Sequence, residues 1–187
     1  MKIDKLSIDG PLLVEPHRIG DHRGFFSETF RADRFEEAAG PVRFVQDNQS
    51  LSALKGTIRG LHYQKNPRAQ GKLVRVIRGA ILDVAVDIRT GSSTYGEHVA
   101  VELSAENWRQ LWIPPGFLHG FATLTDACEV IYKVTDYYSR DHDAGVRWND
   151  PMIAVPWPFA EGEAVLSDKD KTAPLLSEIG QEFAYRP

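Results

Sequence analysis

The sequence contains little cysteine and no long apolar segment. Cys128 is the single cysteine among 187 residues, so no disulfide can form within the chain. No segment approaches the roughly 20 consecutive apolar residues of a membrane helix, and the first residues, Met1–Lys5, lead into no apolar signal core. These features predict a soluble, cytoplasmic protein without a membrane partner.

Runs of like charge are also missing. Lysine and arginine number 22 against 26 aspartates and glutamates, which gives a formal net charge of −4. This balance disfavours nucleic acid or a membrane surface as the main partner. An anionic ligand would have to be a small molecule that individually placed cations bind.

The residues that are present suit one compact β domain over residues 1–187. Hydrophobic residues make up 42% of the chain and aromatic residues 10%, enough for a sizeable core. Turn signals recur about every 8–12 residues, a spacing typical of an all-β sandwich or barrel. The expected strands are Val42–Val45, Thr57–Tyr63, Lys72–Ile77, Ile81–Ile88, Val99–Leu103, Gln110–Ile113, Phe121–Leu124 and Val130–Thr135. Along Ile81–Ile88 the alternation places Asp83 and Asp87 opposite an apolar face, and one interpretation is that these two carboxylates merely line solvent.

Few helices are expected. Asp33 is predicted to be an N-cap with Glu36 at the third helical position and Gly40 as the stop. A second short helix is predicted after Ser167. The proline-rich last forty residues are expected to wrap a core of roughly residues 23–150 as loops and short helices.

The segment Ile113–Phe121 is the most informative part of the chain. Its Pro-x-Gly-x-x-His pattern follows a predicted strand and directs His119 into the space that the sheet encloses. The pattern resembles the second signature of the cupin superfamily. An ordinary hydrogen-bonded core histidine is the alternative interpretation.

Many cupins bind a metal through a His-x-His cluster and a glutamate on an earlier strand. The corresponding segment, Arg59–Gln64, offers His62 alone, with Gln64 where the second histidine would fall and no glutamate nearby. A transition-metal site normally needs at least three side-chain ligands, so two histidines are too few. We therefore interpret His62 and His119 as proton-transfer or substrate-binding groups and expect no metal.

A histidine base needs a carboxylate that fixes its tautomer. The sequence alone leaves four candidates for His62, namely Asp83, Asp87, Asp168 and Asp170. Arg59 and His62 would point to opposite faces of a regular strand. Both can line one cavity only if Gly60 marks a bulge that resets the alternation.

Ten motifs, in order and in register from about Arg23 to Asp170, together resemble the dTDP-4-dehydrorhamnose 3,5-epimerase family. They are Arg23–Glu28, Phe44–Ser50, Arg59–Gln64, Gln70–Arg75, Asp83–Arg89, the His119 turn, Tyr132–Lys133, Tyr137–Ser139, Arg147–Pro151 and Leu166–Asp170. The resemblance implies a cupin-type jelly roll with a few peripheral helices. It also implies a cofactor-independent isomerase that inverts C3 and C5 of a dTDP-linked 4-keto-6-deoxy sugar on the route to dTDP-L-rhamnose.

The resemblance further assigns roles by position. His62 matches the catalytic base, Asp170 in the C-terminal segment its partner, Tyr132 the proton donor and Lys72 the cation near the keto oxygen. The positions that match substrate contacts are Arg23, Phe26, Glu28, Gln46, Asn48, Arg59, His119, Tyr138, Asp143 and Lys169. Among these, Tyr138 matches the aromatic ring that stacks on thymine. Some members carry glutamate at the position of Asp143, so its contact is expected to be shorter or mediated by water.

The resemblance also implies a homodimer with exchanged N-terminal strands, in which Arg23 and Glu28 complete the site of the partner. Two alternatives remain. The first is an epimerase that acts at only one of C3 and C5. The second is a catalytically silent sugar-nucleotide binding module, which is disfavoured because a binder needs no paired base and acid such as His62 and Tyr132.

Overall fold

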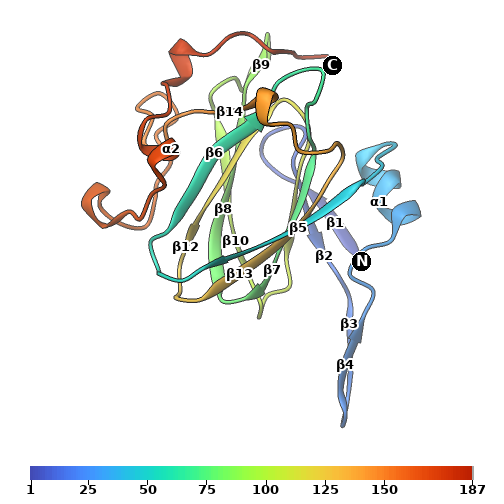
Figure 1. Ribbon diagram of the computed structural model, residues 1–187. Coiled ribbons are helices and arrows are strands. Elements are labelled where there is room, and N and C mark those ends of the chain that lie inside the picture. The colour runs from blue at the N-terminus through green and yellow to red at the C-terminus, as the bar shows by residue number, and fades with distance from the viewer. Residues whose placement is uncertain (187) are drawn as a thin grey trace.

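Two antiparallel sheets that face each other dominate the computed structural model, which describes residues 1–186 (Figure 1). In spatial order, the six-stranded sheet comprises β1 (Lys2–Lys5), β2 (Leu12–Glu15), β11 (Gln110–Ile113), β7 (Lys72–Arg78), β13 (Cys128–Val134) and β5 (Gln46–Ser52). The five-stranded sheet comprises β10 (His98–Ser104), β8 (Ala80–Asp87), β12 (Phe117–Thr123), β6 (Ile58–Gln64) and β14 (Asp143–Gly145). The predicted all-β class is confirmed.

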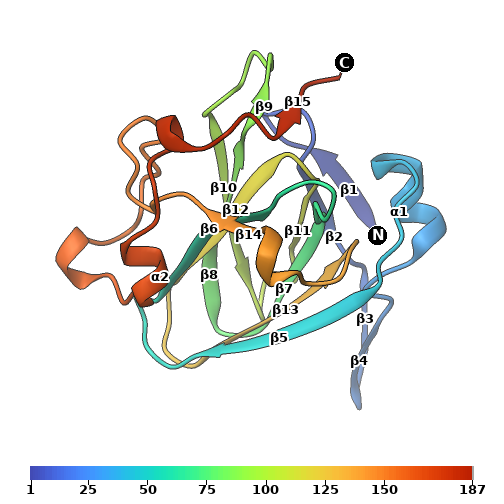
Figure 2. The same cartoon turned by 45° about the horizontal axis from the view of Figure 1, so that its top comes forward.

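Smaller elements surround the two sheets. A hairpin of β3 (Arg18–Asp21) and β4 (Gly24–Ser27) projects away from the body (Figures 1 and 2). Near the C-terminus, β15 (Phe183–Ala184) pairs in parallel with β9 (Arg89–Thr90). The helical segments are α1 (Ala32–Ala39), η1 (Arg140–His142), η2 (Glu161–Glu163), α2 (Asp168–Lys171) and η3 (Leu176–Glu178). Among the described residues, no helix combines the length and the apolar character that crossing a membrane requires.

Most strands expected between residues 57 and 135 form with shifted ends, but Val42–Val45 is wrong. The strand lies directly after it, in β5. Val42 and Phe44 instead pack beside buried Phe35 of α1, outside the sheets. The strand expected at Phe121–Leu124 begins earlier, at Phe117.

The six-stranded sheet also begins before residue 23, the expected start of the core. Strand β2 pairs with β11 and β1 pairs with β2, so the first fifteen residues contribute two strands. Each has four residues, and Pro11 and Pro16 flank β2. A run this short between prolines gives little alternation from which a strand could be predicted.

The predicted N-cap of α1 is wrong, whereas its stop is confirmed. Arg31 is the N-cap, and Asp33 lies in the first turn, where its carboxylate binds the Arg31 guanidinium at 2.7 and 2.8 Å. This ion pair occupies the side chain that was expected to cap the helix. Gly40 ends the helix with φ of 75°. The short helix predicted after Ser167 is α2, with Ser167 as its N-cap.

Both faces of β8 are buried, contrary to the expectation that Asp83 and Asp87 line solvent. Ile81 and Ala85 belong to the core between the sheets. The opposite face packs under the C-terminal segment, which lies along the outside of the five-stranded sheet in both views (Figures 1 and 2). Asp83 and Asp87 are both 0% exposed because they share the inward face. The charged face of this strand therefore points into the molecule.

Candidate active site

A bulge in β6 determines which side chains enter the space between the sheets. His62 is opposite His119 and Arg59 is opposite Phe121, so two residues of β6 face Gly120 alone. Gly60 has φ of +131°, and a Cβ there would lie 2.6 Å from the Cα of Gly120. Only glycine permits this approach. Arg59 and His62 consequently line the same cavity, which confirms the predicted reset of the alternation.

The cavity has two lobes that share His62, Lys72 and Tyr132. The lobe beside α2, called here the α2 lobe, has a volume of about 410 Å³, and its further polar lining residues include Arg59, His119, Ser167 and Asp170. The Tyr138 lobe has a volume of about 430 Å³, and its further lining residues include Gln46, Asn48, Tyr138, Asp143 and Lys169. All the predicted site residues except Arg23, Phe26 and Glu28 meet here.

His62 and Asp170 form a hydrogen-bonded pair although 108 positions separate them. The His62 Nε2 lies 2.5 Å from Oδ1 of Asp170. The carboxylate is 5% exposed, and its other oxygen accepts a hydrogen bond of 2.8 Å from the Ser167 hydroxyl. A carboxylate oxygen accepts, so Nε2 carries the proton and Nδ1 is the nitrogen left to act as a base.

The surroundings keep Asp170 ionised. Burial alone would raise its pKa, but the hydrogen bond and charge of His62, the Ser167 hydroxyl and the charge of Lys169 outweigh burial and lower the pKa below its ordinary value. A permanent negative charge therefore faces the imidazole that would become cationic.

Acid and base candidates project from opposite walls of the cavity. His62 lies on β6 in the five-stranded sheet, whereas Tyr132 lies on β13 in the six-stranded sheet. Burial raises the pKa of the Tyr132 phenol, with a smaller opposing effect from Arg59. The phenol is therefore protonated at neutral pH. A flat ring between the walls would meet a base on one face and an acid on the other.

Lys72 brings positive charge to the junction of the two lobes. Burial lowers the pKa of its ammonium to about 8, and the carboxylates of Asp143 and Asp83 partly oppose this shift. Lys72 is therefore mostly charged at neutral pH and becomes neutral in mild alkali.

Asp83 forms a hydrogen bond with His119 rather than with His62. Its Oδ1 lies 2.7 Å from the His119 Nε2, and its Oδ2 is buried with no hydrogen-bond partner among the described residues. Burial lowers the pKa of His119, against the opposing influence of Asp83. This second His–Asp pair was not predicted. Finding it requires knowing that β8 lies beside β12, where Asp83 is opposite Phe121.

The other two candidate partners of His62 have different roles. Asp87 binds Arg89, Ser92 and Thr94. Asp168 is fully exposed and pairs with Lys171 at the surface. The choice among four carboxylates therefore falls on Asp170, as the family resemblance implies.

Direct hydrogen bonds and an ion pair connect the side chains that line the Tyr138 lobe. The Tyr138 hydroxyl donates to Oδ2 of Asp143 at 3.2 Å, and the Lys169 ammonium binds the same oxygen at 2.5 Å. The Gln46 amide donates to Oδ1 of Asn48 at 2.8 Å. Asp143 thus links a tyrosine and a lysine, and its expected contact with substrate stays a prediction.

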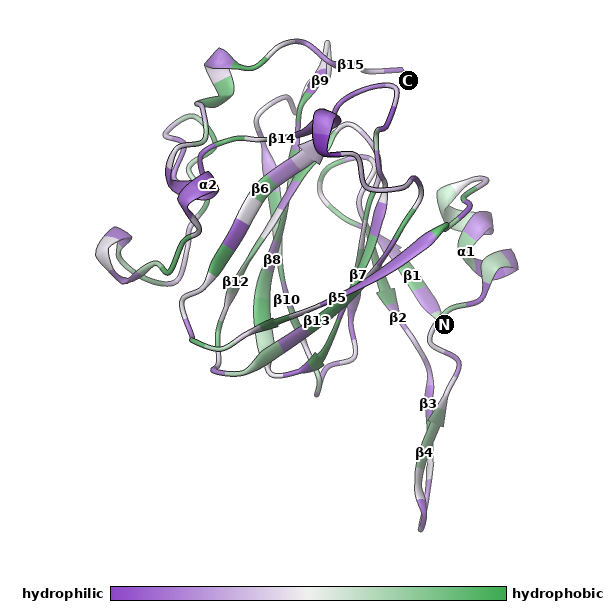
Figure 3. Ribbon diagram, viewed as in Figure 1, coloured by the Kyte–Doolittle hydropathy of each residue, from purple (hydrophilic) through white to green (hydrophobic). Residues whose placement is uncertain are grey.

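Arg23, Phe26 and Glu28 do not reach the cavity of their own chain. They lie on or just after the projecting β3–β4 hairpin (Figure 1). Arg23 pairs with Asp21 and keeps 78% of its side chain exposed, and Phe26 is 71% exposed. Green, hydrophobic colouring is visible on this hairpin (Figure 3), and its residues Ile19, Phe25 and Phe26 are exposed.

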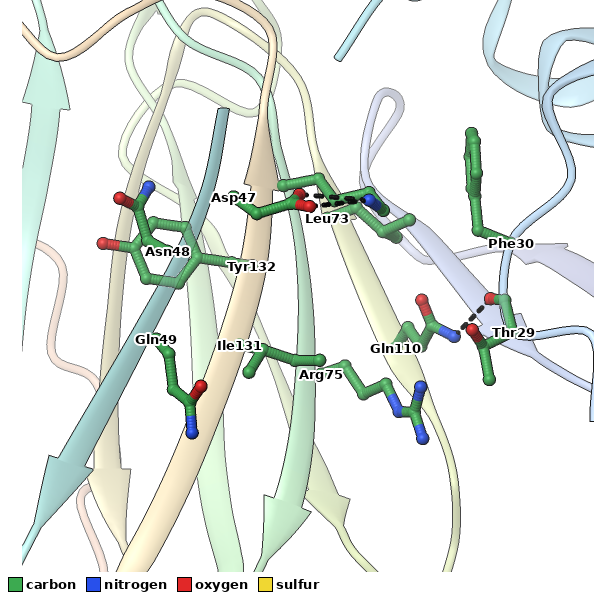
Figure 4. A pocket seen from close by; sticks show the side chains of 11 residues that line it. Thr29, Phe30, Asp47, Asn48, Gln49, Leu73, Arg75, Gln110, Ile131 and Tyr132 are labelled. Atoms are coloured by element: carbon green, nitrogen blue, oxygen red, sulfur yellow. Dashed lines mark hydrogen bonds and ion pairs between the residues drawn. The ribbon is translucent and has the colours of Figure 1, made fainter. Parts of the chain in front are cut away.

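A further hollow of about 270 Å³ lies on the outer face of the six-stranded sheet (Figure 4) and shares Asn48 and Tyr132 with the lining of the cavity. Its lining includes the ion pair of Lys133 with Asp47, and Figure 4 shows the hydrogen bond from Gln110 to the Thr29 carbonyl. His62, Lys72 and Asp170 do not line it. Residues 1–186 contain no group of three or more His, Cys, Asp or Glu side chains placed to hold a metal ion.

The two facing sheets and the histidine-lined space between them define a cupin-type β-barrel, and the paired titratable groups define an acid–base site within it. This class narrows further on comparison with known proteins. The chain belongs to the dTDP-4-dehydrorhamnose 3,5-epimerase family, whose model matches residues 5–178.

Individual relatives agree with this family. The dTDP-4-dehydrorhamnose 3,5-epimerase of Sinorhizobium fredii is 52% identical over 185 residues, which cover 99% of this chain and 94% of the relative. A crystal structure of dTDP-6-deoxy-D-glucose-3,5-epimerase from Legionella pneumophila, in complex with dTDP-4-keto-L-rhamnose, is 48% identical. It matches with a TM-score of 0.94 over 100% of this chain and 99% of that one. A dTDP-4-dehydrorhamnose 3-epimerase of Streptomyces niveus is 37% identical over 95% of this chain and 85% of its own length.

Proposed function

We propose that this chain is a dTDP-4-dehydrorhamnose 3,5-epimerase. It inverts C3 and C5 of dTDP-4-dehydro-6-deoxy-D-glucose through enolate intermediates, on the route to dTDP-L-rhamnose. The observation that carries this proposal is the placement of His62 and Tyr132 on opposite walls of one cavity. The relatives named as 3,5-epimerases are also more similar to this chain than the 3-epimerase is.

The chemistry follows from the ketone at C4. That carbonyl acidifies the protons on both neighbouring carbons, so one site can act twice. His62 Nδ1 takes the proton from carbon, the C–H electron pair becomes the C=C bond of the enolate, and the carbonyl electrons move to oxygen. Asp170 stabilises the imidazolium that results.

The enolate is then protonated from the other face. Lys72, charged below about pH 8, stabilises the developing negative charge on oxygen without reorganisation of solvent. Tyr132 gives its proton to carbon and completes the inversion. The His62 proton leaves to solvent and the phenolate regains one, so no electrons are gained or lost and no redox cofactor is required.

The remaining residues hold the nucleotide. Arg59 and Lys169 supply cations for the diphosphate, and a guanidinium suits this task because it donates two parallel hydrogen bonds. Tyr138 supplies a flat surface for thymine at the edge of its lobe. His119, oriented by Asp83, contacts the sugar beside Lys72.

Proton NMR of dTDP-4-keto-6-deoxyglucose incubated with the protein in D₂O tests this function. Deuterium at both C3 and C5, with both centres inverted, is the expected result. Deuterium at one carbon alone would identify a single-centre epimerase. Absence of exchange at both carbons would contradict catalysis and favour a sugar-nucleotide binder.

Replacing Asp170 with asparagine should lower turnover far more than it weakens nucleotide binding. The amide can present its NH₂ to Nε2 and no longer stabilises the imidazolium, a change that costs roughly 10⁴-fold in the Ser-His-Asp triad. Steady-state kinetics and calorimetric titration with dTDP measure the two effects. Asp168→Asn, on the same helix but fully exposed, is the control. Equal losses of turnover and affinity would assign Asp170 to binding.

Tyr138→Ala should weaken dTDP binding by roughly 1–3 kcal/mol, the usual contribution of stacking between a base and an aromatic ring. Tyr137→Ala is the matched control, because Tyr137 is equally exposed but does not line the lobe. Calorimetric titration with dTDP measures both variants. An unchanged affinity in Tyr138→Ala would place thymine elsewhere.

A homodimer with exchanged N-terminal strands is part of the proposal. Ile19, Phe25 and Phe26 expose 60%, 58% and 71% of their surface on a hairpin that extends from the body. Apolar side chains gathered on one projecting element favour burial against another protein surface. A second copy of the chain would bring Arg23, Phe26 and Glu28 to a cavity that lacks them.

The cytoplasm remains the proposed location, on the basis of the single cysteine.

Coexpression of two inactive variants tests this shared site. In a mixed dimer of Arg23→Glu and His62→Ala chains, one of the two sites regains both native residues, so about a quarter of the parental activity should return after random pairing. Turnover of the mixture is compared with that of each variant expressed alone. A mixture no more active than its components would show that one chain builds the whole site.

A further inference from the structure

Three glutamine side chains hold the loop that carries Tyr138. This loop, residues 136–139, connects β13 to η1, and here it is called the tyrosine loop. The Gln70 amide donates to the Asp136 carbonyl at 2.6 Å. The Gln46 side-chain oxygen accepts from the Tyr138 N–H at 3.1 Å. Backbone groups along the loop are therefore bonded to side chains from β5, from β6 and from the segment before β7.

Gln64 makes the largest number of these contacts. Its Nε2 donates to the Tyr137 carbonyl at 3.2 Å and to the Arg68 carbonyl at 2.6 Å. Its Oε1 accepts from the Ser139 N–H at 2.6 Å. The side chain is on the last residue of β6 and is 4% exposed. One buried amide thus bonds the residues on both sides of Tyr138.

Only a neutral amide can do this at position 64. A side-chain amide offers two N–H donors and an acceptor oxygen, whereas a carboxylate has no donor and an alkyl chain has neither. Two carbonyls and one N–H would lose their partners if the amide were removed. In the sequence, Gln64 stands where a metal-binding cupin carries its second histidine, and here the position serves the loop instead.

We infer that Gln64 is a positioning residue for nucleobase recognition, which acts by holding Tyr138 in its binding orientation before the nucleotide arrives. Tyr138 is 56% exposed, and its ring is held at one end by the hydrogen bond of its hydroxyl to Asp143. The hydrogen bonds to the loop backbone hold the other end, where the side chain leaves the chain. Gln46, Gln64 and Gln70 all line the same lobe as Tyr138. A preorganised loop lowers the cost of binding. This inference rests on the proposed role of Tyr138 in binding thymine.

Gln64→Met keeps the length of the side chain and removes its amide. Calorimetric titration should show that dTDP binds about tenfold more weakly, because the loop must now be ordered on binding. Inorganic pyrophosphate, which lacks the base, should bind within about twofold of its parental affinity, since Gln64 has no hydrogen bond to Arg59 or Lys169, the proposed diphosphate cations. KM for the substrate should rise in parallel with the dissociation constant of dTDP, whereas kcat should stay within about threefold of the parent.

A double-variant cycle separates positioning from general destabilisation. In a Tyr138→Ala background, Gln64→Met should have no further effect on dTDP affinity beyond about twofold, because two residues that act through one contact are not additive. Hydrogen exchange of the Tyr138 and Ser139 amides in the ligand-free variant should speed up. Gln49→Met, at an exposed position of β5 whose amide donates to half-buried Glu129, is the control and should match the parent.

Several outcomes would overturn the inference. Equal losses for dTDP and pyrophosphate would assign Gln64 a merely structural role, as would additive effects with Tyr138→Ala. Unchanged amide exchange would show that the loop does not depend on Gln64. Gln70→Met repeats the test if the Gln64 variant does not fold, with the same expected loss for dTDP alone. If the parent protein fails to bind dTDP, the proposed function is contradicted. If the parent binds dTDP and the Gln64 variant binds it equally well, only this inference is contradicted.

Discussion

Tyr132→Phe should still exchange substrate protons with solvent but no longer invert the carbon that loses them, whereas His62→Ala should lose both activities. Without the phenol, His62 can take a proton and return it, or a solvent deuteron, on the same face of the sugar ring. Without the imidazole, no proton is removed at all. The loss of inversion should reach roughly 10²–10⁴-fold in either variant, the usual contribution of a positioned acid or base.

The experiment compares deuterium incorporation with product stereochemistry in D₂O. His98→Ala, on the edge strand β10 and outside both lobes, is the control for His62 and should behave as the parent. Inversion of C5 by Tyr132→Phe at the parental rate would show that another group is the acid. Exchange that persists in His62→Ala would show that another group is the base.

Lys72→Met should lower kcat by roughly 10²–10³-fold, the loss seen when one preorganised oxyanion contact is removed. The parent itself should lose activity as the pH rises through about 8, where the Lys72 ammonium deprotonates. The Tyr132 phenol, with its pKa raised above the ordinary value of 10, is not the cause of a fall in that range. Lys133→Met, which removes an exposed lysine paired with Asp47 on the outer face, is the control.

As the pH rises through this range, the stability of the folded protein should increase, whereas its activity falls. The folded protein lowers the pKa of Lys72 from 10.5 to about 8, so folding disfavours the charged form. The contribution of this group to stability is complete above the unfolded pKa and is lost as the pH falls through about 8. Lys72→Met should therefore melt no lower than the parent at pH 7.

For the catalytic role of Lys72, a pH-independent kcat between pH 7 and about 10 would contradict the assignment of the ammonium.

Features that depend on local pattern could be predicted from the sequence. The alternating strands from β6 to β13, the helix after Ser167 and the bulge at Gly60 all follow from neighbouring residues. The resemblance to a family supplied what local pattern cannot, because His62 and Asp170 meet across 108 positions. By local pattern alone, four aspartates fitted equally well as the partner of His62.

The contacts that could not be predicted depend mostly on which elements are neighbours in the folded chain. Asp83 reaches His119 because β8 pairs with β12, and Gln64 reaches Ser139 because the chain returns past the end of β6. Asp33 fits the pattern of an N-cap, but an arginine two residues earlier takes its carboxylate. In each case a tertiary or ionic contact outweighed the local preference.

The late position of Asp170 in the chain sets the order in which the site is completed during synthesis. The ribosome makes His62 and both walls of the cavity well before it makes the short helix α2. Until that helix emerges, the imidazole has no carboxylate to fix its tautomer. A nascent chain that has not yet reached α2 therefore holds His62 without its carboxylate partner, and the pair can form only after the segment that follows β14 has been made.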